Sequence, residues 1–189
     1  MFSLQINQPE PPTLDSLLKR YKNNRRLRKV TPVYESMLVE AKRQIKIAFI
    51  YGQFPHSTVE TLHPWLSTDT TDVILAICTL GPELDNSINR LSKEDLLTAV
   101  ILKEIALAWI VNLTREIHRA ARRQIAQNGL KVGPAYRPGV GRWPIEAQQT
   151  IFAHLPAADI GVTLDDYLMM RPTISTSLII PIIDRSQTK

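Results

Sequence analysis

The sequence predicts a single α+β domain, spanning residues 13–189, that follows an irregular lead-in over residues 1–12. Three observations favour this class: strand-like apolar runs at 45–51 and 73–80, and a long helical pattern over 92–129. The length of 189 residues, with 44% hydrophobic and 22% charged residues, is typical of one folded globular domain. This composition excludes collagenous, mucin-like and disulfide-scaffold proteins.

The N-terminal part of the domain, residues 13–44, is predicted to be helical and basic. Thr13 can cap a first helix. The apolar residues of this helix repeat at i, i+3, i+4 and i+7 and so share one face: Leu14, Leu17, Leu18 and Tyr21. Thr31 followed by Pro32 predicts the start of a second short helix, because proline is favoured at the first helical position.

Two segments in the next part of the chain predict strands. Residues 45–51 alternate apolar side chains, with further apolar residues between them, so both faces of this strand are expected to be covered. Residues 73–80 form a continuous apolar run that ends at Gly81 and Pro82, which is typical of a buried strand entering a turn. A short helix over 83–91 is expected to follow.

The longest predicted helix begins near Ser92 and Asp95, which resemble a capping box, and runs to Gly129. Its first half is apolar on nearly all sides and its second half is rich in charge, so we expect it to run from the core into solvent. Lys103 and Glu104 lie in the middle of the apolar half. Charges at that depth are costly in a bilayer, so the pattern argues against membrane insertion.

The last part of the chain mixes short elements. The pattern predicts a strand over 130–136, a turn over 138–144, a helix over 144–155 and a strand over 175–183. Pro181 would place that last strand at a sheet edge, because proline cannot donate to a hydrogen-bond ladder.

The basic character of the chain is local. Residues 19–29 contribute seven positive charges without an acid, and removing them from the net charge of +5 leaves −2. This run can be a solvated loop, a docking site for an acidic partner such as an electron carrier or a corrinoid protein, or a contact for nucleic acid. Nucleic acid is the least favoured, because only Tyr21 could stack on bases. The candidate partner-binding residues are Arg25, Arg26, Arg28 and Lys29.

The sequence shows no pattern of catalytic or metal-binding side chains. The four histidines lack metal-ligand spacing, and no Ser-His-acid grouping is recognisable, so no catalytic or metal residue is assigned. Cys78 is the single cysteine and lies within an apolar run, where it is expected to behave as a small hydrophobic residue. One cysteine and no signal-peptide pattern lead us to expect a cytoplasmic protein.

The turn around Pro138 is the most informative local sequence. Gly139 and Gly141 allow positive φ and close approach of a ligand to the backbone, and arginines flank them at 137 and 142. Such a turn before a helix can bind an anionic group, although a plain proline-glycine connection with solvated arginines remains the alternative. The candidate ligand-binding residues are Tyr136, Arg137, Pro138, Gly139, Val140 and Gly141.

Five segments in order resemble the activation-domain-like family of cobalamin-dependent methionine synthase. They are 79–85 (TLGPELD), 128–130 (NGL), 138–146 (PGVGRWPIE), 160–164 (IGVTL) and 172–183. The resemblance covers the chain after the lead-in and implies an antiparallel, twisted sheet flanked by helices, with one long central helix.

The resemblance also implies a function in methionine biosynthesis. Domains of this family bind S-adenosylmethionine and present its methyl group to a reduced cobalamin on a partner module, with electrons from a flavodoxin-like donor. This displacement requires positioning more than acid or base catalysis. The chain has no Asp-x-His-x-x-Gly corrinoid motif, so cobalamin is expected only on a partner protein.

The sequence departs from the family pattern at four positions. Where the family's ligand motif has arginine and tyrosine, this chain has Ala135 and Val140, and two cations near the C-terminus are replaced by Thr173 and Ile174. These departures support an alternative: a non-catalytic interaction or structural subunit that has lost the ligand and docks a partner through its basic N-terminal segment.

Overall fold

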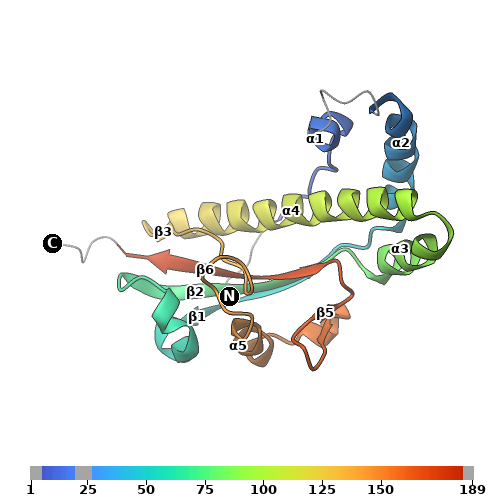
Figure 1. Ribbon diagram of the computed structural model, residues 1–189. Coiled ribbons are helices and arrows are strands. Elements are labelled where there is room, and N and C mark those ends of the chain that lie inside the picture. Colours follow the sequence, from blue (N-terminus) through green and yellow to red (C-terminus); the bar gives the residue numbers. More distant parts are fainter. Residues whose placement is uncertain (1–5, 20–26, 185–189) are drawn as a thin grey trace.

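The computed structural model describes residues 6–19 and 27–184. A four-stranded sheet forms the centre, and the long helix α4 (Leu96–Ala126) lies along one of its faces (Figure 1). The short helix α5 (Ala147–His154) and the 3-10 helices η2 (His56–Trp65) and η3 (Ala157–Ile160) pack on the other face. The predicted α+β class, with an antiparallel sheet and one long central helix, is confirmed.

The sheet has the order β1-β2-β6-β3, and every neighbouring pair is antiparallel. Its strands are β1 (Ala48–Pro55), β2 (Thr70–Thr79), β6 (Ser175–Ile183) and β3 (Lys131–Val132). A separate two-stranded hairpin, which the sequence patterns did not predict, joins β4 (Thr163–Leu164) to β5 (Met170–Arg171). The strands of this hairpin have only two residues each, too few for an alternating pattern to be recognised.

The prediction that Pro181 puts the last strand at an edge is wrong, because β6 lies between β2 and β3. The Pro181 carbonyl accepts a 2.8 Å bond from the Gly133 N–H, on the β3 side. The N–H and C=O of one residue in an antiparallel strand point to the same side, so the missing donor also faces β3. That strand ends at Val132, and the ladder to β2 loses no bond.

Both predicted N-terminal helices exist, although Tyr21, which the first was expected to include, lies outside the described residues. In α1 (Leu14–Leu18) the Thr13 side chain accepts a hydrogen bond from the Ser16 N–H, as the cap prediction required. The helix α2 (Leu27–Gln44) begins five residues before Pro32, the predicted first helical residue, and so contains this proline. Proline there removes one intrahelical donor, a loss that a helix of 18 residues tolerates.

The first strand begins later than predicted. Ile45 closes the last turn of α2 through its N–H to the Ala41 carbonyl, and the Lys46 N–H bonds the Leu80 carbonyl. Pairing with β2 begins at Ala48 opposite Thr79. The apolar residues of 45–51 therefore occupy partly buried positions, first in a connection and then in a strand.

Helices α3 (Pro82–Glu94) and α4 follow the predicted order, but the start of α4 needs a correction. Asp95 alone caps it, accepting from the Thr98 N–H and hydroxyl. Ser92 belongs to α3, where its hydroxyl bonds the Ile88 carbonyl.

The expectation that α4 runs into solvent is also wrong. Apolar and small residues of its second half repeat at helical spacing and stay buried: Leu113, Thr114, Ile117, Ala120, Ala121 and Ile125. The cations of this half occupy the remaining sides of the helix. The helix therefore packs along β2, β6 and β3 over its whole length.

The length and composition of α4 would suffice for a membrane span, but its position in the fold explains its apolar character. Many of its side chains are buried in the larger of two apolar cores, against β2 and β6. Lys103 is exposed and Glu104 is half-buried at its middle. The helix is therefore the core helix of this domain.

Candidate functional site

The turn after β3 is closed by its own backbone. The Gly139 N–H donates to the Trp143 carbonyl at 3.0 Å, and the Trp143 N–H donates to the Val140 carbonyl at 3.3 Å. Gly139 and Gly141 have φ of +77° and +64°, a region that favours glycine, as the sequence predicted. Tyr136 joins this turn to the sheet through two backbone bonds with Ile179, of 2.8 and 2.9 Å.

Three aromatic rings support the turn from the α5 side of the sheet. The Tyr136 and Trp143 ring centroids are 5.0 Å apart, and those of Trp65 and Trp143 are 6.1 Å apart. Arg142 fastens the outer part of the turn to η2, because its Nη2 donates to the Trp65 carbonyl at 3.2 Å. Trp143 is only 3% exposed, and its indole N–H has no hydrogen-bond acceptor among the described residues.

Arg137 points from the turn toward α4. Its Nη2 donates a long bond of 3.4 Å to the Thr114 hydroxyl, while its Nε is buried without a partner in the described part of the chain. No carboxylate of residues 6–19 or 27–184 forms an ion pair with it. Arg137 is therefore a half-buried cation with unused hydrogen-bonding capacity.

Cys78 lies close enough to Arg137 for their charges to interact. Burial raises the pKa of the Cys78 thiol to about 12, and the positive charge of Arg137 opposes this only in part. The thiol therefore stays protonated at neutral pH, the state in which it packs in the core and is a poor nucleophile.

The residues of the turn and its neighbour Ala135 therefore fall into two groups, one exposed to solvent and one on the side of α4. Val140 is 58% exposed, and a Cβ at Gly141 would meet no atom within 4 Å. The Gly141 N–H also has no partner within residues 6–19 and 27–184. Ala135, in contrast, packs against the core beneath α4, on the side toward which Arg137 points.

The candidate partner-binding residues lie elsewhere. Arg25 and Arg26 fall outside the described residues, whereas Arg28 and Lys29 lie in the first turn of α2. Figure 1 shows α2 beside α4, on the side away from the sheet and the aromatic turn. Within the described ranges, no three His, Cys, Asp or Glu side chains lie close enough to hold a metal ion.

Comparison with known proteins identifies the fold. One solved structure, the MetH reactivation domain bound to AdoHcy, matches with a TM-score of 0.61 over 98% of this chain and 80% of that chain. The fold resembles that of the MetH reactivation domain. The sequence identity between the two is 13%, so the similarity lies in the fold. No protein-family model and no curated protein sequence matches the chain.

Sequence reasoning missed two parts of the site. Trp143 lies within the predicted turn but was not among the candidate residues, and no element or role was predicted for the segment that contains Trp65. The contact between Arg137 and Thr114 joins residues 23 positions apart, and no local pattern indicates it.

Proposed function

We propose that this chain is an accessory protein in corrinoid-dependent methyl transfer, which binds S-adenosylmethionine for reductive remethylation of cobalamin on a partner protein. The observation that carries the proposal is the fold match over 98% of the chain to a domain whose structure contains AdoHcy. The ordered segments of sequence resemblance, from TLGPELD to the C-terminal strand, support it independently.

The residues of the turn suit such a ligand. An amino acid carboxylate requires a cation, and Arg137 has a buried Nε without a partner in the described chain. The free Gly141 N–H adds a backbone donor beside an open position. When bound, S-adenosylmethionine would supply an activated methyl group on its sulfonium.

The task of the chain in this reaction would be positioning. Gly139 and Gly141 let the ligand approach the backbone, and Arg137 would orient its carboxylate. Tyr136 and Trp143 hold the turn rigidly against the sheet. The transfer of a methyl group needs no general acid or base from these residues.

The partner would be a corrinoid-binding protein or a methionine synthase module, with an acidic electron carrier as a further partner. The cations Arg25, Arg26, Arg28 and Lys29 would steer the approach of such acidic surfaces. We place the protein in the cytoplasm, with neither membrane nor nucleic acid as its partner.

A second candidate is a non-catalytic interaction subunit on the same fold. The observation in its favour is that Ala135 and Val140 supply no polar side chain, while Arg137 is turned toward Thr114 in α4. In this case the basic N-terminal segment would dock a protein partner and the turn would be structural.

Calorimetric titration with S-adenosylmethionine and with S-adenosylhomocysteine tests the proposal. We expect micromolar binding that Arg137→Ala weakens at least tenfold, because a charge-assisted bond contributes about 1.5–3 kcal/mol. Arg142→Ala is the matched control: it lies in the same turn but bonds the Trp65 carbonyl, so binding should stay close to wild type. Absence of heat up to millimolar ligand would refute ligand binding and leave the interaction subunit.

A further inference from the structure

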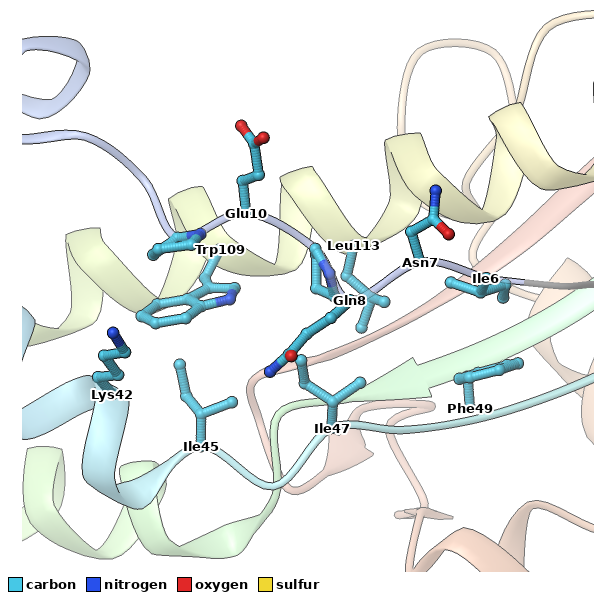
Figure 2. A pocket seen from close by; sticks show the side chains of 12 residues that line it. Ile6, Asn7, Gln8, Glu10, Lys42, Ile45, Ile47, Phe49, Trp109 and Leu113 are labelled. Carbon is cyan, nitrogen blue, oxygen red and sulfur yellow. The ribbon is translucent and has the colours of Figure 1, made fainter.

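A cavity lies at the opposite edge of the sheet from the aromatic turn. Lead-in residues 6–11 cross the gap between α4 and the chain that enters the edge strand β1 (Figure 2). They line one side of a cavity that is partly open to solvent and has a volume of about 560 Å³, within the range of roughly 300–1,000 Å³ that small-molecule sites occupy. Nothing in the proposed methyl-transfer function uses this cavity.

Hydrogen bonding and burial hold the lead-in in place as one wall of this cavity. The Asn112 side chain on α4 donates a 3.0 Å hydrogen bond to the Glu10 carbonyl and so fastens the segment to the helix. Pro9 and Pro12 are buried beside it, and Leu17 and Leu18 of α1 anchor the chain further on. The cavity is therefore a feature of the fold.

One half of the cavity carries its polar groups. Trp109 is only 5% exposed, and its indole N–H has no acceptor among the described residues. Figure 2 shows the nitrogen edge of this ring and the Gln8 amide facing the same space, whereas the Lys42 ammonium lies beyond the opposite edge of the ring, at the end of the cavity beside Ile45. Lys42 is exposed and forms no ion pair within residues 6–19 and 27–184. A buried donor and an unpaired cation together favour an anionic acceptor.

The other half is apolar. Ile47 and Leu113 form its middle, and Phe49 and Ile6 close the far end. The nearest acid, Glu10, contributes backbone to the wall, and its carboxylate points away from the cavity in Figure 2. An anion at the Lys42 end therefore meets no facing carboxylate, and an apolar body beyond it meets hydrocarbon.

We propose that this cavity binds an amphipathic carboxylate with an aliphatic body. Its carboxylate accepts from the Trp109 N–H and the Gln8 amide and is neutralised by Lys42. Its chain extends along Ile47 and Leu113 toward Phe49. The aliphatic walls favour an alkyl chain, and the elongated arrangement of the lining, with polar groups at one end, suits a linear acid.

Sodium decanoate, kept below its micellar concentration, is the probe for this site. In ¹⁵N-labelled full-length protein the three tryptophans give three indole resonances, which Trp109→Phe assigns by loss of one of them. We expect the Trp109 resonance to shift saturably as the buried N–H gains an acceptor. Trp143 is an internal control, because its indole N–H is also buried without a described partner but lies outside this cavity.

Two further arms separate the charge from the apolar body. Lys42→Met keeps the apolar stem and should weaken the binding of decanoate about fivefold. This factor corresponds to the upper end of the free energies that exposed ion pairs contribute. Lys93→Met, a cation of α3 outside the cavity lining, should leave the affinity unchanged. Decanol should bind wild type about as weakly as decanoate binds Lys42→Met.

The proposal is overturned if the Trp109 resonance does not move, or if all three indole resonances move together without saturation. Equal affinity of decanoate for wild type and Lys42→Met would overturn the assignment of a carboxylate ligand.

Discussion

The two faces of the sheet are built differently. On one face a single helix of 31 residues covers the strands, with aliphatic side chains at regular helical spacing along its length. On the other, the eight-residue helix α5, the 3-10 helices η2 and η3, and an aromatic turn cover the strands together. The first arrangement concentrates stability in one element, whereas the second leaves backbone amides and glycines accessible to a ligand. We conclude that the α4 face is mainly scaffold, whereas the candidate site lies at the turn, which rests on aromatic rings of the α5 face and directs Arg137 toward α4.

Truncation of buried leucines on the two faces should show the largest effects. Leu102→Ala in α4 should cost about 3–4 kcal/mol, because a long helix packed along the sheet cannot collapse into the void. Leu155→Ala beside α5 should cost about 2–3 kcal/mol, since short segments relax more readily. Unfolding in urea, followed by circular dichroism, measures both.

Leu107→Ala is the control for these truncations. Leu107 lies on the same helix as Leu102 but is 47% exposed, so its loss should cost less than about 0.5 kcal/mol. If Leu155→Ala proved costlier than Leu102→Ala, the contrast between the faces would be reversed.

Substitution of one buried polar aromatic side chain on each side should have the next largest effect. The buried Tyr34 hydroxyl donates to Glu104 of α4, so Tyr34→Phe should cost about 1–2 kcal/mol. Trp143→Phe removes an N–H without a described partner, which offsets part of the lost packing, and should cost less than about 1 kcal/mol. Thermal unfolding of both variants ranks them, and the opposite order would contradict the hydrogen-bond assignment.

Substitution of two glycines with positive φ distinguishes an effect on stability from an effect on ligand binding. Gly129, at the end of α4, and Gly141, in the turn, both have open space at the Cβ position. Alanine at either should cost about 1 kcal/mol through backbone strain alone. Only Gly141→Ala should weaken the binding of S-adenosylhomocysteine, as measured by calorimetry. Equal affinities in the two variants would remove the turn from the binding site.

The N-cap of α4 should give the smallest effect, and a dependence on pH. Hydrogen bonds from the Thr98 hydroxyl and N–H hold the pKa of Asp95 below its usual value. Because the folded-state pKa is the lower one, this stabilisation is complete above the unfolded value of 3.8 and is lost as pH falls through the folded value. Asn at this position still caps but cannot ionise.

Melting temperatures of wild type and Asp95→Asn across pH 2–7 test this sign. Wild type should melt above the variant at pH 7, and the difference should vanish in acid. A difference that grows with acidification would contradict the direction of the pKa shift.

Much of the scaffold could be predicted from sequence because its signals are local. The Thr13 cap, the apolar run of β2 and the Asp95 cap are all visible within a few residues. The edge prediction from Pro181 was wrong because its cost depends on which neighbouring strand the missing N–H would face. In β6 that neighbour is the short strand β3. Partners along a sheet are set by tertiary pairing, and no local pattern contains that information.

The candidate site was predictable only as a turn. Positive φ at Gly139 and Gly141 follows from residue type, and the structure confirms it. The direction of Arg137 toward Thr114, and the contact of Trp65 with Trp143, depend on how distant segments pack. The role of the turn in ligand binding stays a prediction.

Titration of ¹⁵N-labelled protein with S-adenosylhomocysteine tests the central claim most directly, because the indole resonances report on both faces at once. We predict a saturable shift of the Trp143 resonance, which lies beneath the turn, while the Trp109 resonance on α4 stays in place. A Trp143 resonance unmoved at millimolar ligand, or a shift confined to Trp109, would contradict a ligand site at the turn.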